Sequence, residues 1–237
     1  MLVRLALAFF LGVNMSKKKS GDIVLIMAEI GVMAALGFVL DELSGIMFKG
    51  IFINGGSIGI AMLCVLLMAY RRGFVPAFIT GLIMGLLDLA TGPYIIPGEA
   101  WRAVVQVILD YVAAYPLVAV ASIFRPFFMA SESKKQKILF LCLGSFLGGL
   151  LKLFVHYLSG ILFWADPSSF AFSWEWMNPH LYCFLYNALY VIPCTALSLA
   201  FLIILFLRSP SLLNDPHRLY QRANKGNESQ NNDKEGE

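Results

Sequence analysis

The chain has 237 residues, of which 59% are hydrophobic and 14% are charged, and its mean hydropathy is +0.73. A soluble domain carries about 25% charged residues, so this composition argues against an ordinary soluble protein and indicates a membrane protein. The net charge of +3 arises from basic residues confined to short loops, which excludes a nucleic-acid-binding surface.

The N-terminal residues 1–14 are apolar but too short to span a bilayer, and no small-residue cleavage site follows them. Met15 precedes Ser16 and a run of lysines, so we expect the natural start at Met15, with an interfacial N-terminal segment as the alternative. In either case residues 1–21 are predicted to form a cytoplasmic N-terminal segment.

Six apolar segments follow, each bounded by charges or by Gly, Pro or Asn. They cover residues 23–40, 54–70, 74–90, 101–124, 138–164 and 179–207. The second and third are short and are joined by a tight turn, Arg71-Arg72-Gly73. We therefore predict an all-α membrane protein, a six-transmembrane-helix bundle over residues 22–208, followed by a disordered cytoplasmic tail over 209–237.

Basic residues are distributed unevenly between the two sides of this bundle. One side holds Lys17, Lys18, Lys19, Arg71, Arg72, Arg125, Lys134, Lys135, Lys137 and Arg208, whereas the other holds Lys49 and Arg102. Because cytoplasmic loops are enriched in lysine and arginine, we expect both termini in the cytoplasm.

Polar side chains inside the predicted spans are costly, so they usually face a cavity or one another. Asp110, His156 and Asn187 each lie about 12–13 Å inside the outer ends of three different spans, at a helical rise of about 1.5 Å per residue. We expect these side chains to meet in one pocket. Asp88 is placed nearer the outer surface, and Glu29 near the cytoplasmic end is expected to be structural or to face a partner.

Several of these residues have a structural explanation as well. Lys152 shares a helix face with His156, and an internal ion pair or a snorkelling side chain explains it. His156 is explained equally well by a hydrogen bond across helices and by ligand contact. Aromatic residues near the same level form either an interfacial belt or the faces of a ligand pocket; they are Tyr94, Trp101, Tyr111, Trp164, Trp174, Trp176, Tyr182 and Tyr186.

Small residues four apart occur as three pairs, Gly31/Ala35, Gly81/Gly85 and Gly144/Gly148. Such pairs let another helix approach closely, either within the bundle or on a separate membrane protein. The sequence does not distinguish the two roles.

An enzymatic alternative rests on Gly55-Gly56-Ser57-Ile58-Gly59, which matches the G-x-S-x-G pattern of serine hydrolases, with His156 as a base. That pattern requires a strand-to-helix elbow, whereas glycines and serine before a short helix are also an ordinary cap. The four cysteines have neither metal-site nor disulfide spacing, and no metal, phosphate-binding or other cofactor motif is present, so we expect no cofactor.

The chain resembles the substrate-capture (S) components of energy-coupling-factor (ECF) vitamin transporters, a group of ABC transporters, and most closely the thiamine-specific ones. The resemblance runs from about Ala28 to Leu207 and rests on five groups of residues. These are 28–36 (AEIGVMAAL), 70–73 (YRRG), 109–111 (LDY), 156–160 (HYLSG) with Trp164, and 182–187 (YCFLYN).

The resemblance implies a six-helix bundle in the cell membrane that binds thiamine near its outer face without catalysis. It assigns ligand contact to Asp110, Tyr111, His156, Trp164, Tyr182 and Asn187. It also implies that Gly31, Ala34 and Ala35 dock a transmembrane coupling subunit, which two ATPase subunits power.

Two departures from the family pattern keep a thiamine precursor or another vitamin open as the ligand. The family's usual acid at the acid-Tyr pair is Glu, whereas this chain has the shorter Asp110. The first outer loop of the family often carries an aromatic lid, and here the loop offers Phe48 and Phe52 but no Trp.

Overall fold

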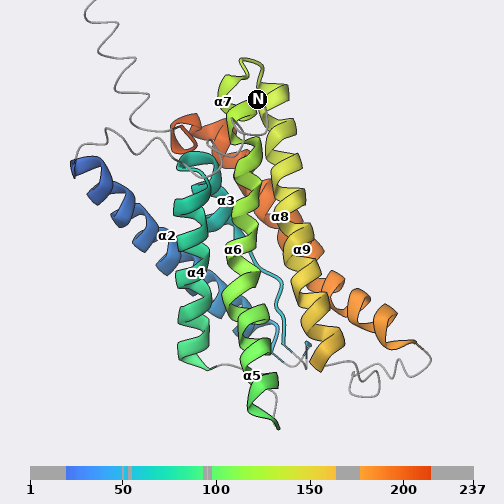
Figure 1. Cartoon of the computed structure of the whole chain (residues 1–237). Helices are drawn as coiled ribbons and strands as arrows, with labels where there is room; N and C mark the ends of the chain where they lie inside the picture. The colour runs from blue at the N-terminus through green and yellow to red at the C-terminus, as the bar shows by residue number, and fades with distance from the viewer. Residues whose placement is uncertain are drawn as a thin grey trace, which may run out of the picture.

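The protein is described by a computed structural model for residues 20–49, 51–52, 55–92, 95, 98–163 and 177–214. Within these ranges the chain forms helices and connecting segments and no β-strand. The helices pack into an elongated bundle, with α7 near one end and α5 at the other (Figure 1). The all-α prediction is therefore confirmed.

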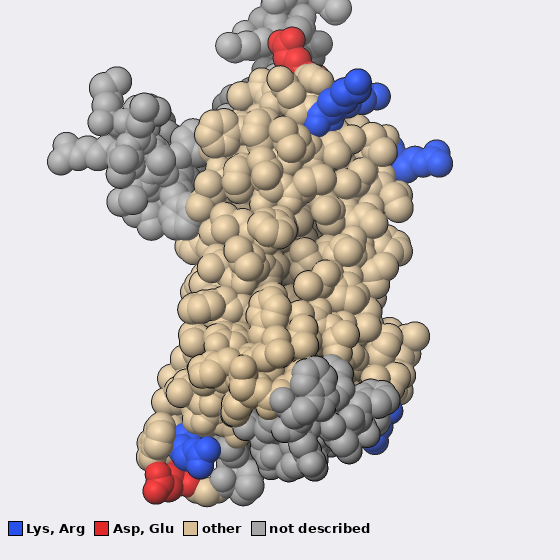
Figure 2. Space-filling view, turned by 90° about the vertical axis from the view of Figure 1, so that its right-hand side faces the viewer, with Lys and Arg blue, Asp and Glu red and all other residues tan. Residues whose placement is uncertain are grey.

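Among the described residues, five helices are long and apolar enough to cross a membrane. They are α2 (Ser20–Met47), α4 (Phe74–Thr91), the interrupted helix Ala100–Ala130, α8 (Lys134–Phe163) and α9 (Pro179–Arg208). On the face drawn in Figure 2, charged side chains lie at the two ends and the surface between them is uncharged. This distribution suits a protein whose middle is surrounded by lipid hydrocarbon.

The second predicted span, 54–70, was wrong in its first half. Helix α3 covers only Met62–Arg71, and residues 55–61 are not helical. Gly55 and Gly56 have φ values of 86° and 112°, which lie in the left-handed region outside helical backbone. Ten helical residues span about 15 Å, half of a bilayer core of about 30 Å. Almost all of α3 is buried, so it forms the centre of the bundle.

The interrupted helix changes its winding four times. It consists of α5 (Ala100–Val107), a π-helical turn (Ile108–Ala113), α6 (Ala114–Val118), a 3₁₀ turn (Ala119–Phe124) and α7 (Arg125–Ala130). Pro116 has no backbone N–H and therefore cannot bond to the carbonyl four residues back, which lies in the π-helical turn. A wide turn accommodates that missing bond. The helix also continues six residues past the predicted end of the fourth span at 124.

Two of the three small-residue pairs pack inside the bundle. A Cβ added at Gly85 would lie 1.7 Å from the carbonyl oxygen of Tyr111, so α4 contacts the π-helical turn directly. A Cβ at Gly148 would lie 3.0 Å from a carbonyl oxygen of the interrupted helix. Because neither position has room for a larger residue, these pairs hold helices together within this chain.

At the α7 end, four charged residues form what we call the arginine hub: Glu29, Arg71, Arg72 and Arg125. The carboxylate of Glu29 on α2 accepts from Arg71 at 2.8 Å and from Arg72 at 2.5 Å, both at the end of α3. The Arg125 guanidinium on α7 donates to the backbone carbonyls of Tyr70, at 2.8 Å, and Arg71, at 3.2 Å. The hub thereby joins α2, α3 and α7, and it gives Glu29 the structural role expected for it.

The chain that follows α9 also attaches to the hub. Nη1 of Arg71 donates to the carbonyls of Ser211, Leu212 and Asn214 at 2.9–3.3 Å, around the short 3₁₀ helix η5 (Pro210–Leu212). The Leu213 side chain is fully buried in the core that surrounds α3. The predicted tail therefore begins with a segment, 209–214, that packs on the bundle.

Candidate functional site

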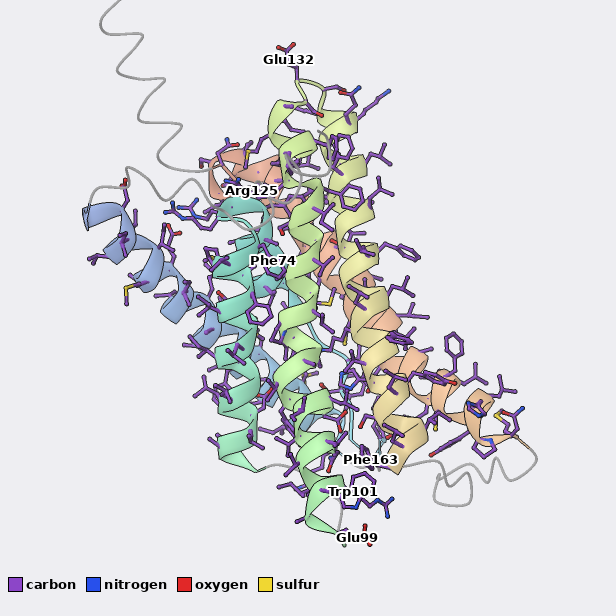
Figure 3. All side chains as sticks on the ribbon, in the orientation of Figure 1. Phe74, Glu99, Trp101, Arg125, Glu132 and Phe163 are labelled. Atoms are coloured by element: carbon purple, nitrogen blue, oxygen red, sulfur yellow. The ribbon has the colours of Figure 1, made fainter. Side chains whose placement is uncertain are left out.

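A cavity of about 340 Å³ lies among the helices toward the α5 end. Its wall includes side chains from α2, α4, the interrupted helix, α8 and α9, and backbone from the non-helical residues 55–61. Cavities of about 300–1,000 Å³ are typical of small-molecule sites. Figure 3 places Glu99, Trp101 and Phe163 at the α5 end, and Arg125 and Glu132 at the opposite end.

Asp110 and His156, predicted at one depth on separate spans, are neighbours in the cavity wall. The carboxylate oxygen Oδ1 of Asp110 lies 3.5 Å from Nδ1 of His156, and its Oδ2 accepts a hydrogen bond of 2.8 Å from Ser159. The carboxylate and the imidazole keep 18% and 15% of their side-chain surface exposed, so neither is sealed from the cavity. Asp110 lies in the π-helical turn, a feature that often marks functional positions.

Asn187 on α9 is held in the same wall by hydrogen bonds to its own helix. Its Nδ2 donates to the carbonyl of Cys183 at 2.8 Å, and its Oδ1 accepts from the hydroxyl of Tyr190 at 2.5 Å. The Tyr190 ring stands edge-on to His156, with 5.8 Å between ring centroids. Asn187 is thereby held in one orientation, and these two bonds use one of its two amide hydrogens and one of the two acceptor positions on Oδ1.

Aromatic rings line the cavity beside these polar groups. Tyr111, Tyr182 and Tyr186 all contribute to its wall, and the rings of Tyr182 and Tyr186 lie 5.9 Å apart. Phe52, from the predicted outer loop, packs against Tyr186 and Tyr190 at 6.0 and 5.5 Å. The structure thus brings five of the six predicted ligand residues to one cavity. The sixth, Trp164, lies outside the described residues.

Comparison with known proteins identifies the family. The thiamine transporter protein family matches residues 27–214. The chain belongs to this family.

Two relatives are each named thiamine transporter ThiT. The one from Bacillus subtilis is 29% identical over 188 residues, covering 78% of this chain and 92% of the relative. The one from Lacticaseibacillus paracasei is 27% identical over 195 residues, covering 80% and 90%. A solved structure of ThiT from Listeria monocytogenes superimposes with a TM-score of 0.64 at 26% identity, covering 81% of this chain and 98% of that one.

Membership of the thiamine transporter family decides two of the predictions made from the sequence. The protein is a multi-pass protein of the cell membrane, and its function is transport rather than catalysis. The serine-hydrolase alternative is therefore wrong. Ser57 lies in the non-helical segment of the cavity wall, and the strand that a nucleophile elbow requires is absent from the described part of the chain.

Residues from several elements complete the site although they were not predicted to contact ligand. Asp41, Glu42 and Asp88 contribute further carboxylates to the cavity wall. The first predicted span ended at residue 40, but α2 continues to Met47 and so carries Asp41 and Glu42 into the bundle. Ser159 follows His156 by three residues, and this helical spacing was a signal that could have identified it.

Lys152 also lines the cavity and is only 7% exposed. Its ammonium lies 3.6 Å from the centroid of the Tyr115 ring, a close cation–π contact. This inward position contradicts the predicted snorkelling side chain, whereas the internal ion pair stays a prediction, because the charge of Lys152 acts on the Asp88 carboxylate of the same cavity wall. The lysine points inward, where an aromatic face compensates part of the cost of burying its charge.

The three predicted docking residues on α2 differ in their surroundings. Gly31 and Ala35 are exposed, and nothing lies within 4 Å of a Cβ added at Gly31. Ala34 is 1% exposed and packs in the core of this chain. The Gly31/Ala35 pair thus differs from the pairs Gly81/Gly85 and Gly144/Gly148, against which other helices of this chain pack.

Proposed function

We propose that this protein is the S component of an ECF-type ABC transporter and captures thiamine from the outside of the cell. The observation that carries this proposal is the joining of Asp110, His156 and Asn187, from three helices, in one aromatic-lined cavity. The family membership and the ThiT names of the relatives agree with it.

The chemistry of the cavity suits a cationic aromatic ligand. Thiamine carries a positively charged thiazolium ring and an aminopyrimidine. The Asp110 carboxylate accepts from the amino group or balances the thiazolium charge, and Tyr111 and Tyr182 offer ring faces to the cation. Trp164 is included among the proposed ligand contacts on the family resemblance. Asn187 and His156 supply further hydrogen bonds.

The proposed topology has six membrane segments, with the short α3 counted as one because it is enclosed by the others. Both termini lie in the cytoplasm, so the arginine hub is at the inner side and the cavity opens toward the outer side. Non-helical backbone at residues 55–61 is tolerated at membrane depth because it lines a cavity rather than facing lipid.

We assign the Gly31/Ala35 face of α2 to a separate transmembrane coupling subunit, with two ATPase subunits supplying energy. An exposed small-residue pair on a lipid-facing helix allows close helix–helix approach. Ala34, about 80° around the helix from the middle of this pair, packs in the core and supports the helix from within.

The proposal is tested by titrating purified protein with thiamine in an isothermal calorimeter. We expect submicromolar affinity, and weaker binding of the separate aminopyrimidine and thiazole halves, because each half makes only part of the contacts. Tighter binding of one half would assign the site to a precursor. A lack of heat with all three compounds would reject this ligand class.

A further inference from the structure

Residues 55–59 form a cavity wall without helical hydrogen bonds of their own. Gly55, Gly56, Ser57 and Gly59 all line the cavity, yet helix α3 does not begin until Met62. Backbone polar groups at membrane depth need partners, because hydrocarbon provides none. The N–H of Gly55 donates to the nearby carbonyl of Phe52 at 3.2 Å, and further partners come from another element.

Helix α9 supplies these partners at two positions one above the other. The backbone N–H of Gly59 donates to Sγ of Cys194 at 3.3 Å, and the same thiol donates to the carbonyl of Ser57 at 3.1 Å. Two turns earlier on α9, the hydroxyl of Tyr186 donates to the carbonyl of Gly55 at 2.8 Å. A thiol can donate and accept at once, so Cys194 bridges an N–H and a C=O that a helix would have paired within itself.

Close packing on both sides makes the position of this wall specific. A Cβ at Gly56 would lie 2.8 Å from the ring of Tyr190, and one at Gly59 would lie 1.9 Å from the hydroxyl of Ser44 on α2. Tyr190 in turn holds the Oδ1 of Asn187. A shift of segment 55–59 toward α9 would therefore displace the Tyr190 side chain, which orients Asn187, a predicted ligand residue.

We propose that Cys194 is a positioning residue of the ligand site. Its thiol fixes segment 55–59 as a cavity wall by bridging Gly59 and Ser57, and it thereby keeps Tyr190 and Asn187 in their binding arrangement. This role extends the proposed function, on which it rests, to a residue outside the predicted ligand contacts. Cys64 on α3 is not equivalent: it is also buried, but its thiol makes no hydrogen bond to any described residue.

Three variants test this assignment: Cys194→Ala, which removes the bridge, Cys194→Ser, which keeps a donor and an acceptor, and Cys64→Ala as a matched control. Hydrogen exchange of the peptide that contains Gly59, measured by mass spectrometry without ligand, reports directly whether the Gly59 amide is protected by the bridge. We expect the exchange rate of the Gly59 amide to rise about tenfold in Cys194→Ala. The rate should stay within about threefold of the wild-type rate in Cys194→Ser and equal the wild-type rate in Cys64→Ala.

The second readout is the dissociation rate of thiamine from the same variants. We expect release to be about tenfold faster from Cys194→Ala, largely restored in Cys194→Ser and unchanged in Cys64→Ala. Unchanged exchange at Gly59 in Cys194→Ala would overturn the bridge. Faster exchange with unchanged thiamine release would overturn the positioning role. Wild-type protein that binds no thiamine would reject the proposed function, and the exchange data would still decide whether the bridge exists.

Discussion

The two ends of the bundle use polar groups in opposite ways. At the α7 end, Glu29 forms ion pairs with two arginines, Arg71 and Arg72. The guanidinium of Arg71 also donates hydrogen bonds to backbone carbonyls of segment 209–214. At the α5 end, Asp110 accepts one hydrogen bond from Ser159, lies 3.5 Å from Nδ1 of His156 and borders a cavity. A charge-paired end resists deformation, whereas an end with polar groups bordering a cavity can receive a ligand.

This contrast predicts that variants at the α7 end change stability while variants at the α5 end change affinity. The largest effect is expected for Leu213→Ala, which removes a fully buried side chain from the segment that packs on the hub. We expect a loss of about 2–5 kcal/mol in unfolding free energy. The measurement is thermal unfolding in detergent, and thiamine affinity of the folded protein should stay the same.

The neighbouring Leu212→Ala is the matched control, because Leu212 is 40% exposed. It should unfold at nearly the wild-type temperature. Equal losses in the two variants would mean that segment 209–214 does not pack as described.

Asp110→Asn examines the cavity end. The change keeps the shape of the side chain but removes its charge, so thiamine affinity should fall by about 1.5–3 kcal/mol, measured by calorimetry. Glu99→Gln, at an exposed position near the same end, is the control and should bind normally. An affinity unchanged by Asp110→Asn would remove this carboxylate from the site.

Glu29→Gln examines the hub itself. The variant leaves Arg71 and Arg72 without their carboxylate, and we expect a loss of about 1–2 kcal/mol in unfolding free energy, limited by the partial exposure of the pair. Glu132→Gln, in the exposed turn before α8, should have no effect on unfolding. If Glu29→Gln instead weakened thiamine binding as strongly as Asp110→Asn, the two ends would not be independent.

The smallest effect on folding is expected for Gly31→Ala, because an added Cβ there meets no atom within 4 Å. Its unfolding free energy should change by less than about 0.5 kcal/mol. Gly85→Ala, which places a Cβ against the Tyr111 carbonyl, should lose about 1–3 kcal/mol by the same measurement. The larger Gly31→Leu should fold normally but assemble poorly with the coupling subunit in a pull-down experiment, and normal assembly would exclude this face as the docking surface.

The sequence predicted the features that depend on hydropathy and helical spacing. The meeting of Asp110 with His156 followed from equal depths on two spans, and the Arg71-Arg72-Gly73 turn followed from two apolar segments with almost nothing between them. The role of each small-residue pair could not be predicted in the same way. Gly31 and Gly85 occur in similar small-residue patterns in the sequence. Only the position of the neighbouring helices shows that Gly31 lies on an uncovered face and that Gly85 packs against the interrupted helix.

Features that depend on backbone irregularity were also missed. Residues 55–61 carry no charge and lead directly into α3, so hydropathy joins them to the helix in one predicted span, although Gly55 and Gly56 are exposed and have positive φ values. Asp41 was excluded from the membrane by its charge, although α2 continues past it to Met47. The bridge made by Cys194 depends on a contact between residues far apart in the chain, which no local pattern records.

The π-helical turn at Ile108–Ala113 has a consequence for how this chain can vary. One extra residue in a helix rotates everything beyond it by about 100° relative to an uninterrupted α-helix. Asp110 and Tyr115 both border the cavity across this turn. A lineage that lost a single residue between positions 108 and 113 would regain a regular helix but could direct only one of those two side chains toward the cavity, so this stretch should tolerate replacement more readily than deletion.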